Sequence, residues 1–173
     1  PAMRDLMTQV LKDILGDVNK DVIDEKILKF KKEMKTSDIQ NISLPTGVKK
    51  LSKFKDSTPR DAVFTNMKKG TPVHVKAAWV YNDLLKYWGL NNFEKIKSSE
   101  KIKWIYLKPN TMNIKQIGFK GYDDPPKIME FIEQNIDYDK LFTRALEKKI
   151  RMFYEALKWD MPVDKANTLE RFF

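Results

Sequence analysis

The helical spacing of apolar residues is the feature that most constrains the fold, because it recurs at both ends of the chain. In the stretch "MRDLMTQVLKDILG", apolar side chains recur every three or four residues until Gly16, as they do in an amphipathic helix. The stretch "KDVIDEKILKFKKEMK" repeats this pattern, with lysines along its other side. Only a short loop separates the two segments, so the sequence predicts an antiparallel helix pair.

Two further helices are predicted in the last third of the chain. The stretch "DDPPKIMEFIEQN" has the form of a short helix entered through prolines. The stretch "YDKLFTRALEKKIRMFYEALKW" predicts one long helix, and a tail follows Pro162. The apolar positions expected to form the buried stripe of the long helix are Leu141, Phe142, Ala145, Leu146, Ile150, Phe153 and Leu157.

The middle of the chain has a different texture. Residues 36–61 are rich in Ser, Thr, Pro and Lys without a sustained period, which indicates a long basic connector. Residues 71–89 favour a helix that closes at Gly89. The stretches "KIKWIYLKPN" and "IKQIGFKG" alternate like strands and predict a small antiparallel β-hairpin.

These elements predict an α+β fold that is predominantly helical. It consists of an antiparallel helix pair, a long basic connector, a small antiparallel β-hairpin, a long C-terminal helix and an extended tail. A chain of 173 residues is most simply one domain, so we expect a single domain over residues 1–162 and a flexible tail over residues 163–173.

The net charge of +9 is concentrated in two segments. Residues 47–76 carry eight basic and two acidic side chains, and residues 91–122 carry seven lysines and two glutamates. The first 46 residues are neutral, with eight charges of each sign. Clustered lysines beside neutral helices favour a surface that binds a polyanion such as nucleic acid, although a lysine-rich surface can also serve only solubility.

The usual catalytic and metal-binding patterns are missing from the sequence. There is no cysteine, His74 is the only histidine, and no glycine spacing matches a phosphate-binding loop. Asp123 and Asp124 directly precede Pro125 and Pro126, so we expect them to cap a helix rather than hold magnesium. No apolar run is long enough to cross a bilayer. The sequence therefore predicts a soluble binding protein without a catalytic residue, cofactor, metal site or membrane partner.

Taken in order, these elements resemble the C-terminal thumb domain of family B replicative DNA polymerases from T-even-like bacteriophages. The resemblance rests on "PAMRDLMTQVLKDIL", "NISLPTGVKKLSKF", "TPVHVKAAWVYN", "KIKWIYLKPN", "IDYDKLFTRALEKKI" and the aromatic terminus. It implies a fragment or split part of a polymerase, in the cytoplasm of an infected bacterial host. The catalytic palm with its magnesium, the fingers and the exonuclease would then be the partners of this chain.

The resemblance also implies that the chain grips the primer–template duplex through phosphate and minor-groove contacts. The residues expected to contact DNA first are Asn41, Ser43, Thr46, Gly47, Lys49, Lys50, Lys53 and Lys55. Lys101, Lys103 and Lys108 are expected to add further contacts. Near the terminus, Leu169, Phe172 and Phe173 have a spacing similar to that of peptides that bind sliding clamps, which implies a clamp as another partner.

Two alternative functions belong to other classes. The chain could be a free-standing helical adaptor whose lysines only confer solubility. It could also be a single-strand DNA-binding accessory protein that stacks bases on Trp79, Trp88, Trp104 and Tyr106. Because these aromatic residues lie mostly on apolar faces, we expect them to pack in the core instead.

Overall fold

The computed structural model describes residues 1–56 and 64–163, and its contacts divide the chain into two compact units. The first unit comprises residues 1–42 and the chain from residue 138 onward, and the second comprises residues 43–137. The predicted fold class is confirmed, because the described chain is predominantly helical with one small antiparallel sheet. The sequence indicated no boundary inside residues 1–162.

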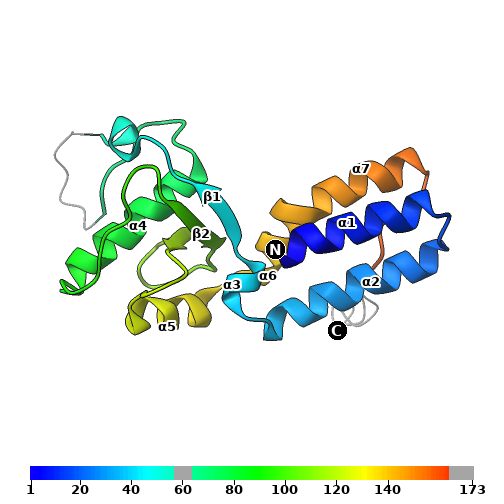
Figure 1. The fold of residues 1–173 in the computed structure, drawn as a ribbon, viewed down its shortest axis with the longest axis horizontal. Coiled ribbons are helices and arrows are strands. Elements are labelled where there is room, and N and C mark those ends of the chain that lie inside the picture. Colours follow the sequence, from blue (N-terminus) through cyan, green and yellow to red (C-terminus); the bar gives the residue numbers. More distant parts are fainter. Residues whose placement is uncertain (57–63, 164–173) are drawn as a thin grey trace. The chain divides into compact units, whose positions relative to one another are not determined.

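The first unit begins with the predicted helix pair, α1 (Ala2–Leu15) and α2 (Lys20–Glu33), which run antiparallel and side by side (Figure 1). Gly16 ends α1, and the side chain of Asn19 caps α2 by accepting a hydrogen bond from the backbone N–H of Asp21 at 2.9 Å. A short turn η1 (Met34–Thr36) and the four-residue helix α3 (Ile39–Ile42) follow.

A buried carboxylate joins α1 to α2. Asp13 is 6% exposed, and it accepts hydrogen bonds from Gln9 Nε2 at 2.8 Å and from Lys26 Nζ at 2.6 Å. The hydrogen bond from the Lys26 ammonium lowers the pKa of the Asp13 carboxyl below its ordinary value. Lys26 therefore contributes to the packing of the helix pair and is not a free surface charge.

The predicted long C-terminal helix is present, but a wider turn interrupts its period. It comprises α6 (Tyr138–Phe142), a π-helical segment η3 (Thr143–Glu147) and α7 (Lys148–Ala156). Its buried side chains are Leu141, Phe142, Leu146, Ile150 and Tyr154. The predicted burial of Phe153 and Leu157 is wrong, because they are 38% and 40% exposed. The additional residue in the π-turn rotates the following helix and brings Tyr154 inward, where its hydroxyl donates to Asp24 Oδ1 at 2.6 Å.

The second unit is built on a three-stranded antiparallel sheet with strand order β1-β2-β3. The predicted hairpin is confirmed as β2 (Lys101–Tyr106) and β3 (Gln116–Phe119). The prediction that residues 36–61 form only a connector is wrong, because this segment supplies α3, β1 (Leu44–Gly47) and the turn η2 (Leu51–Phe54). Strand β1 was missed because four residues that include a proline and a glycine carry too little alternation to be read as a strand.

Helix α4 (Val73–Tyr87), as predicted, packs against β3 at a very short distance. A Cβ atom placed on Gly118 would lie 3.1 Å from Ile102 Cδ1 and 3.2 Å from the carbonyl oxygen of Ala77. Gly118 and the small side chain of Ala77 therefore let the helix backbone approach the sheet. The buried face of α4 consists of Val75, Ala77, Ala78, Tyr81, Asn82, Leu84 and Leu85.

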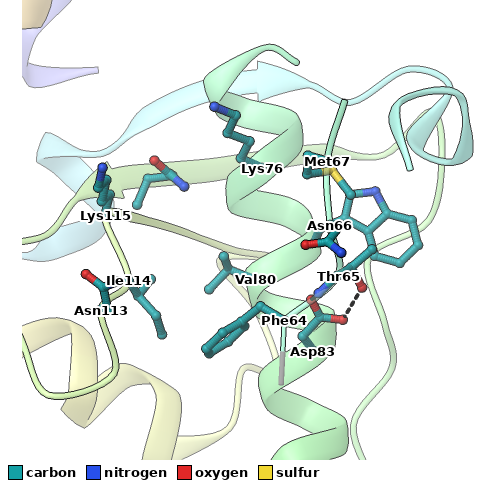
Figure 2. A pocket seen from close by; sticks show the side chains of 12 residues that line it. Phe64, Thr65, Asn66, Met67, Lys76, Val80, Asp83, Asn113, Ile114 and Lys115 are labelled. Atoms are coloured by element: carbon teal, nitrogen blue, oxygen red, sulfur yellow. Dashed lines mark hydrogen bonds between the residues drawn. The ribbon is translucent and has the colours of Figure 1, made fainter. Parts of the chain in front are cut away.

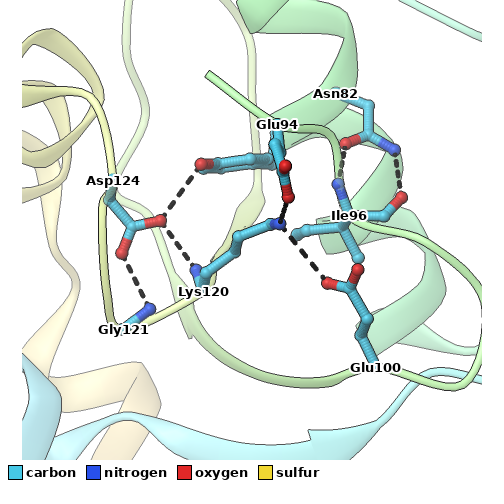
Figure 3. Close-up of polar contacts among 8 residues, drawn as sticks. Asn82, Glu94, Ile96, Glu100, Lys120, Gly121 and Asp124 are labelled. Atoms are coloured by element: carbon cyan, nitrogen blue, oxygen red, sulfur yellow. Dashed lines mark hydrogen bonds and ion pairs between the residues drawn. The ribbon is translucent and has the colours of Figure 1, made fainter. Parts of the chain in front are cut away.

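The helix predicted after the paired aspartates is α5 (Pro126–Asn135), but the predicted capping role of the aspartates is wrong. Pro125 occupies the capping position, and no side chain caps the helix. Asp124 instead accepts hydrogen bonds from the backbone N–H groups of Lys120 at 2.8 Å and Gly121 at 2.7 Å, and from the hydroxyl of Tyr81 at 3.1 Å (Figure 3). The carboxylate thus ties α4 to the turn that follows β3.

The loop before β2 is held by polar contacts to α4 and to the end of β3 (Figure 3). The amide of Asn82 exchanges two hydrogen bonds with the backbone of Ile96, at 2.7 and 3.0 Å. The side chain of Lys120 is only 4% exposed, and its ammonium lies 3.8 Å from Glu94 and 3.6 Å from Glu100. These contacts fix residues 94–100 against α4 and β3.

We expect the substitution Gly118→Ala to lower the free energy of unfolding by about 1 kcal/mol. The added methyl group must displace Ile102 or the α4 backbone, and overpacking of this kind costs about 1–3 kcal/mol, partly offset by the lower backbone entropy of alanine, worth about 0.5–1 kcal/mol. Urea denaturation measures the change.

Gly47→Ala is the matched control, since Gly47 also lies in a strand but a Cβ atom there meets no atom within 4 Å. It should leave stability unchanged or raise it slightly. An equal loss in both variants would contradict the close approach of α4 to β3.

Candidate nucleic-acid interface

Most of the excess positive charge belongs to the second unit. Residues 43–137 contain seventeen basic and ten acidic side chains, a net charge of +7, which leaves +2 for the first unit. The division of the chain into units therefore also separates a strongly basic part from a nearly neutral one. A concentration of one charge sign on a small unit raises the local potential that a polyanion experiences.

The pairing of β1 with β2 joins the two basic segments of the sequence. Gly47 lies opposite Lys101 in the sheet, and the backbone of Val48 continues the pairing through hydrogen bonds with Glu100 at 2.9 Å and Ser99 at 2.6 Å. The backbone N–H of Leu51 then donates to Ser98 Oγ at 3.0 Å. Residues 47–51 and 97–101 are thus adjacent although about fifty positions separate them along the chain.

Six exposed lysines lie on these adjoining segments or directly after them, and we call this group the basic edge. Its members are Lys49, Lys50, Lys53, Lys55, Lys97 and Lys101. Within the described residues, none of them forms an ion pair with a carboxylate. Their ammonium groups are therefore available to an external anion.

The loop that carries four of these lysines is anchored to α4. Lys50 has a left-handed backbone (φ 53°), and the chain then turns into η2, where Leu51 is buried and its carbonyl accepts a hydrogen bond from Trp79 Nε1 at 3.0 Å. The ammonium of Lys55 lies 5.5 Å from the centre of the Trp79 ring, a cation–π distance. Lys68 Nζ donates to the carbonyl of Lys53 at 3.0 Å and adds another cation nearby.

The structure brings together only part of the predicted DNA-contact set. The four lysines of residues 49–55 and Lys101 belong to the basic edge, and Gly47 lies opposite Lys101. Lys108 is exposed just after β2. Ser43 is 2% exposed, and Lys103 is half-buried in the central strand. The hydroxyl of Thr46 accepts a hydrogen bond from Trp104 Nε1 at 3.2 Å. Asn41 belongs to the first unit.

The sequence reasoning did not single out Lys97 and Lys68 as contact residues. Both lie in the basic segments that the charge count identified. Their position beside the predicted lysines follows from the pairing of Val48 with Ser99 and Glu100 and from the hydrogen bond to Lys53. The predicted clamp-binding residues Leu169, Phe172 and Phe173 lie outside the described residues.

The aromatic residues that could have stacked on single-stranded bases are engaged inside the unit. Trp104 is 8% exposed and packs edge-to-face on Tyr106, with ring centres 5.0 Å apart. Trp79 is half-buried and donates to Leu51. Trp88 packs edge-to-face on Phe131 at 5.8 Å. The expectation of core packing is confirmed for Trp104, whereas Trp79, Trp88 and Tyr106 are only half-buried.

Within residues 1–56 and 64–163, no group of three or more His, Asp or Glu side chains is placed to hold a metal ion. In the same part of the chain, no helix combines the length and the apolar character needed to cross a bilayer. His74 is half-buried in α4, and burial lowers the pKa of its imidazole.

No protein-family model matches the chain. It is similar to three human proteins over part of its length. The putative protein SSX9 is 33% identical over 61 residues, which are 35% of this chain and 32% of that protein. Protein SSX5 is 28% identical over 83 residues, or 46% of this chain and 44% of that protein, and protein SSX4 is 33% identical over 60 residues, or 35% and 32%. The chain thus spans about a third to less than half of the length of these curated relatives.

These matches contradict the predicted resemblance to a bacteriophage DNA polymerase. The expectation of an infected bacterial cytoplasm is wrong for the same reason, and so is the description of the chain as a polymerase thumb with a sliding-clamp peptide. The resemblance rested on the order of helices, basic loop and hairpin without any decisive motif. An order of elements of this kind does not identify a function, because one fold can host many unrelated functions.

We expect Thr46→Val to lower the free energy of unfolding by about 1 kcal/mol, because it removes the acceptor for the indole N–H of Trp104, which is largely buried. Urea denaturation followed by tryptophan fluorescence measures this. Thr111→Val is the control, since Thr111 is exposed and should be neutral. A variant with normal stability would show that the hydroxyl of Thr46 is free for another role.

Proposed function

We propose that the second unit binds duplex DNA through its phosphate backbone, without reading the base sequence and without catalysing a reaction. The observation that carries this proposal is the basic edge, in which strand pairing gathers exposed lysines that form no ion pair with a carboxylate among the described residues. The lysine ammonium is a point charge on a flexible side chain, so it can contact the phosphate oxygens of DNA whatever the base sequence.

The contrast between Lys120 and the basic edge supports this function. Lys120 is buried and lies near two glutamates, so its charge is compensated within the unit. Lys55 also interacts with the Asp83 carboxylate, but the other lysines of the basic edge repel one another without such compensation, which disfavours their clustering unless a polyanion neutralises them. Phosphate contact releases counterions from the DNA and supplies the free energy of binding.

Single-stranded DNA is a less suitable ligand for the basic edge. Stacking on a single strand requires aromatic faces that are accessible beside the cations. Trp104 is buried, and the rings of Trp79 and Trp88 are half-buried and face Lys55 and Lys127. A duplex presents phosphates on its outside and needs no such faces.

A helical adaptor is the second candidate function, and the first unit carries the observation that favours it. Met152, Phe153 and Leu157 are exposed on or directly after α7, by 69%, 38% and 40%. Phe153 and Leu157 are spaced as i and i+4 and therefore share one helix face, and exposed apolar groups of this kind suit a protein partner. The two functions concern different units and can be tested separately.

The proposed DNA binding should depend steeply on salt. If about four to six lysines contact phosphates, log K should fall against log salt with a slope of about −4 to −5. Replacing Lys49, Lys50, Lys53 and Lys55 by alanine should reduce the magnitude of the slope by about 3. Fluorescence anisotropy with a blunt hairpin duplex over a series of salt concentrations measures both quantities.

The control replaces Lys12, Lys32, Lys35 and Lys149, which are exposed in the first unit. It removes the same total charge, so the slope should stay close to that of the unchanged protein. Lys26 is unsuitable as a control because it pairs with buried Asp13. If the two quadruple variants lose the same affinity and slope, binding follows net charge alone and the basic edge is not the site.

A further inference from the structure

A cavity of about 360 Å³ lies beside α4 in the second unit. Residues 64–67 and residues 113–116 line it on two sides, with Val80 between them (Figure 2). Lys76, Trp79, Val80 and Asp83 line its α4 side. They are spaced as i, i+3, i+4 and i+7 and therefore share one helix face. The volume falls in the range of sites for small organic ligands.

A fixed carboxylate stands at one end of the cavity. Asp83 Oδ2 accepts a hydrogen bond from the backbone N–H of Thr65 at 2.7 Å, and Asp83 Oδ1 accepts one from the Thr65 hydroxyl at 2.8 Å (Figure 2). Burial raises the pKa of Asp83, because its charge is partly withdrawn from water. Each carboxylate oxygen has two lone-pair directions, so each can accept one more N–H donor from a ligand.

The opposite end of the cavity is cationic, and its middle is apolar. Lys76 and Lys115 lie on the side away from Asp83 (Figure 2), and Lys115 is exposed. Phe64, Val80 and Ile114 supply apolar surface between the two ends. Among the described residues that line the cavity, Asp83 is the only acidic one. The ligand should therefore have a donor edge, a flat apolar body and an anionic group.

A nucleotide combines these three features. We propose that the cavity binds one guanine nucleotide, with the base edge on Asp83 and the phosphate on Lys76 and Lys115. Guanine presents its N1–H and its exocyclic amino group side by side, so it can donate to both oxygens of one carboxylate. Thymine presents a single N–H between two carbonyl groups and would place acceptors against Asp83.

The nucleotide is either a free mononucleotide or an unpaired nucleotide at the end of a bound duplex. An unpaired nucleotide at the end of a duplex can be the ligand only if the proposed DNA binding is correct. The position of the cavity next to the basic edge supports this source. Trp79 lines the cavity, and the ammonium of Lys55 from the basic edge lies over its ring at 5.5 Å. A strand that follows the basic edge could thus place its terminal nucleotide in the cavity.

The test compares hairpin duplexes that are blunt or that end in one unpaired guanine or thymine, with guanosine monophosphate alone as a further ligand. The duplex ending in guanine should bind about 5–10-fold more tightly than the blunt one, and the duplex ending in thymine should stay within about twofold of the blunt one, since a bidentate hydrogen-bonded pair favours the right base over a wrong one by at least about fivefold. Guanosine monophosphate should compete away this gain. Equal affinity for all three duplexes together with no binding of the mononucleotide would overturn the proposal.

Two variants test whether the gain in affinity from the unpaired guanine arises in the cavity. Val80→Phe fills the cavity and should abolish the gain from guanine and the binding of the mononucleotide, while affinity for the blunt duplex remains. Lys115→Ala should reduce the gain without a risk to the core, and Lys95→Ala is its matched control, since Lys95 is exposed and does not line the cavity. Retention of the full gain in both cavity variants would also overturn the proposal.

The same measurements separate the cavity from the basic edge. If the unchanged protein binds guanosine monophosphate but not the blunt duplex, the proposed DNA binding fails and the cavity is a site for a free mononucleotide. Loss of blunt-duplex binding in the quadruple lysine variant, with mononucleotide binding retained, would support two distinct sites.

Discussion

The close approach of α4 to β3 at Gly118 is the constraint on which the second unit depends. With only a hydrogen at this position, the α4 backbone at Ala77 and the Ile102 side chain come nearer to the strand than a Cβ atom would allow. This distance fixes the height of the helix above the sheet. It thereby places Tyr81 on Asp124, Asn82 on the backbone of Ile96 and Trp79 on the carbonyl of Leu51. The contacts of Asn82 and Trp79 hold the two loops that carry the basic edge.

Helix α4 has one face that packs in the core and another that lines the cavity. Its inner face is buried and meets the sheet, while Lys76, Trp79, Val80 and Asp83 line the cavity. Within the described residues, no buried side-chain nitrogen or oxygen atom lacks a hydrogen-bond partner. The interior polar groups of the unit thus serve its fold. The cations that remain exposed are the ones available for binding a polyanion.

The partial similarity to human SSX proteins and the fold give different kinds of information. The similarity covers from 35% to 46% of the chain and overturns the phage assignment, but it does not identify a ligand. The fold shows which charges are compensated internally and which are exposed. The proposed DNA binding therefore rests on the geometry of the basic edge and not on any relative.

The sequence by itself determined the longer helices and the β-hairpin, but not the short helix α3. Periodicities of 3.6 and 2 persist over α1, α2, α4 and β2, and local spacing is enough to specify such elements. It also determined that two segments hold the excess charge. Where local signals were short or misleading, prediction failed: β1 looked like a connector, Asp124 looked like a cap, and the π-turn moved Phe153 outward.

Only the tertiary structure decided how the charged residues are combined. Nothing near Val48 in the sequence indicates that its hydrogen-bonding partners across the sheet are Ser99 and Glu100. Nor does local sequence show that Ser43 is buried or that Thr46 accepts a hydrogen bond from Trp104. It also does not show that Lys120 lies near two carboxylates while Lys101 forms no ion pair among the described residues. The physical reason is that strand register and burial depend on contacts between residues far apart in the chain. Helix periodicity, in contrast, depends only on residues within a few consecutive turns.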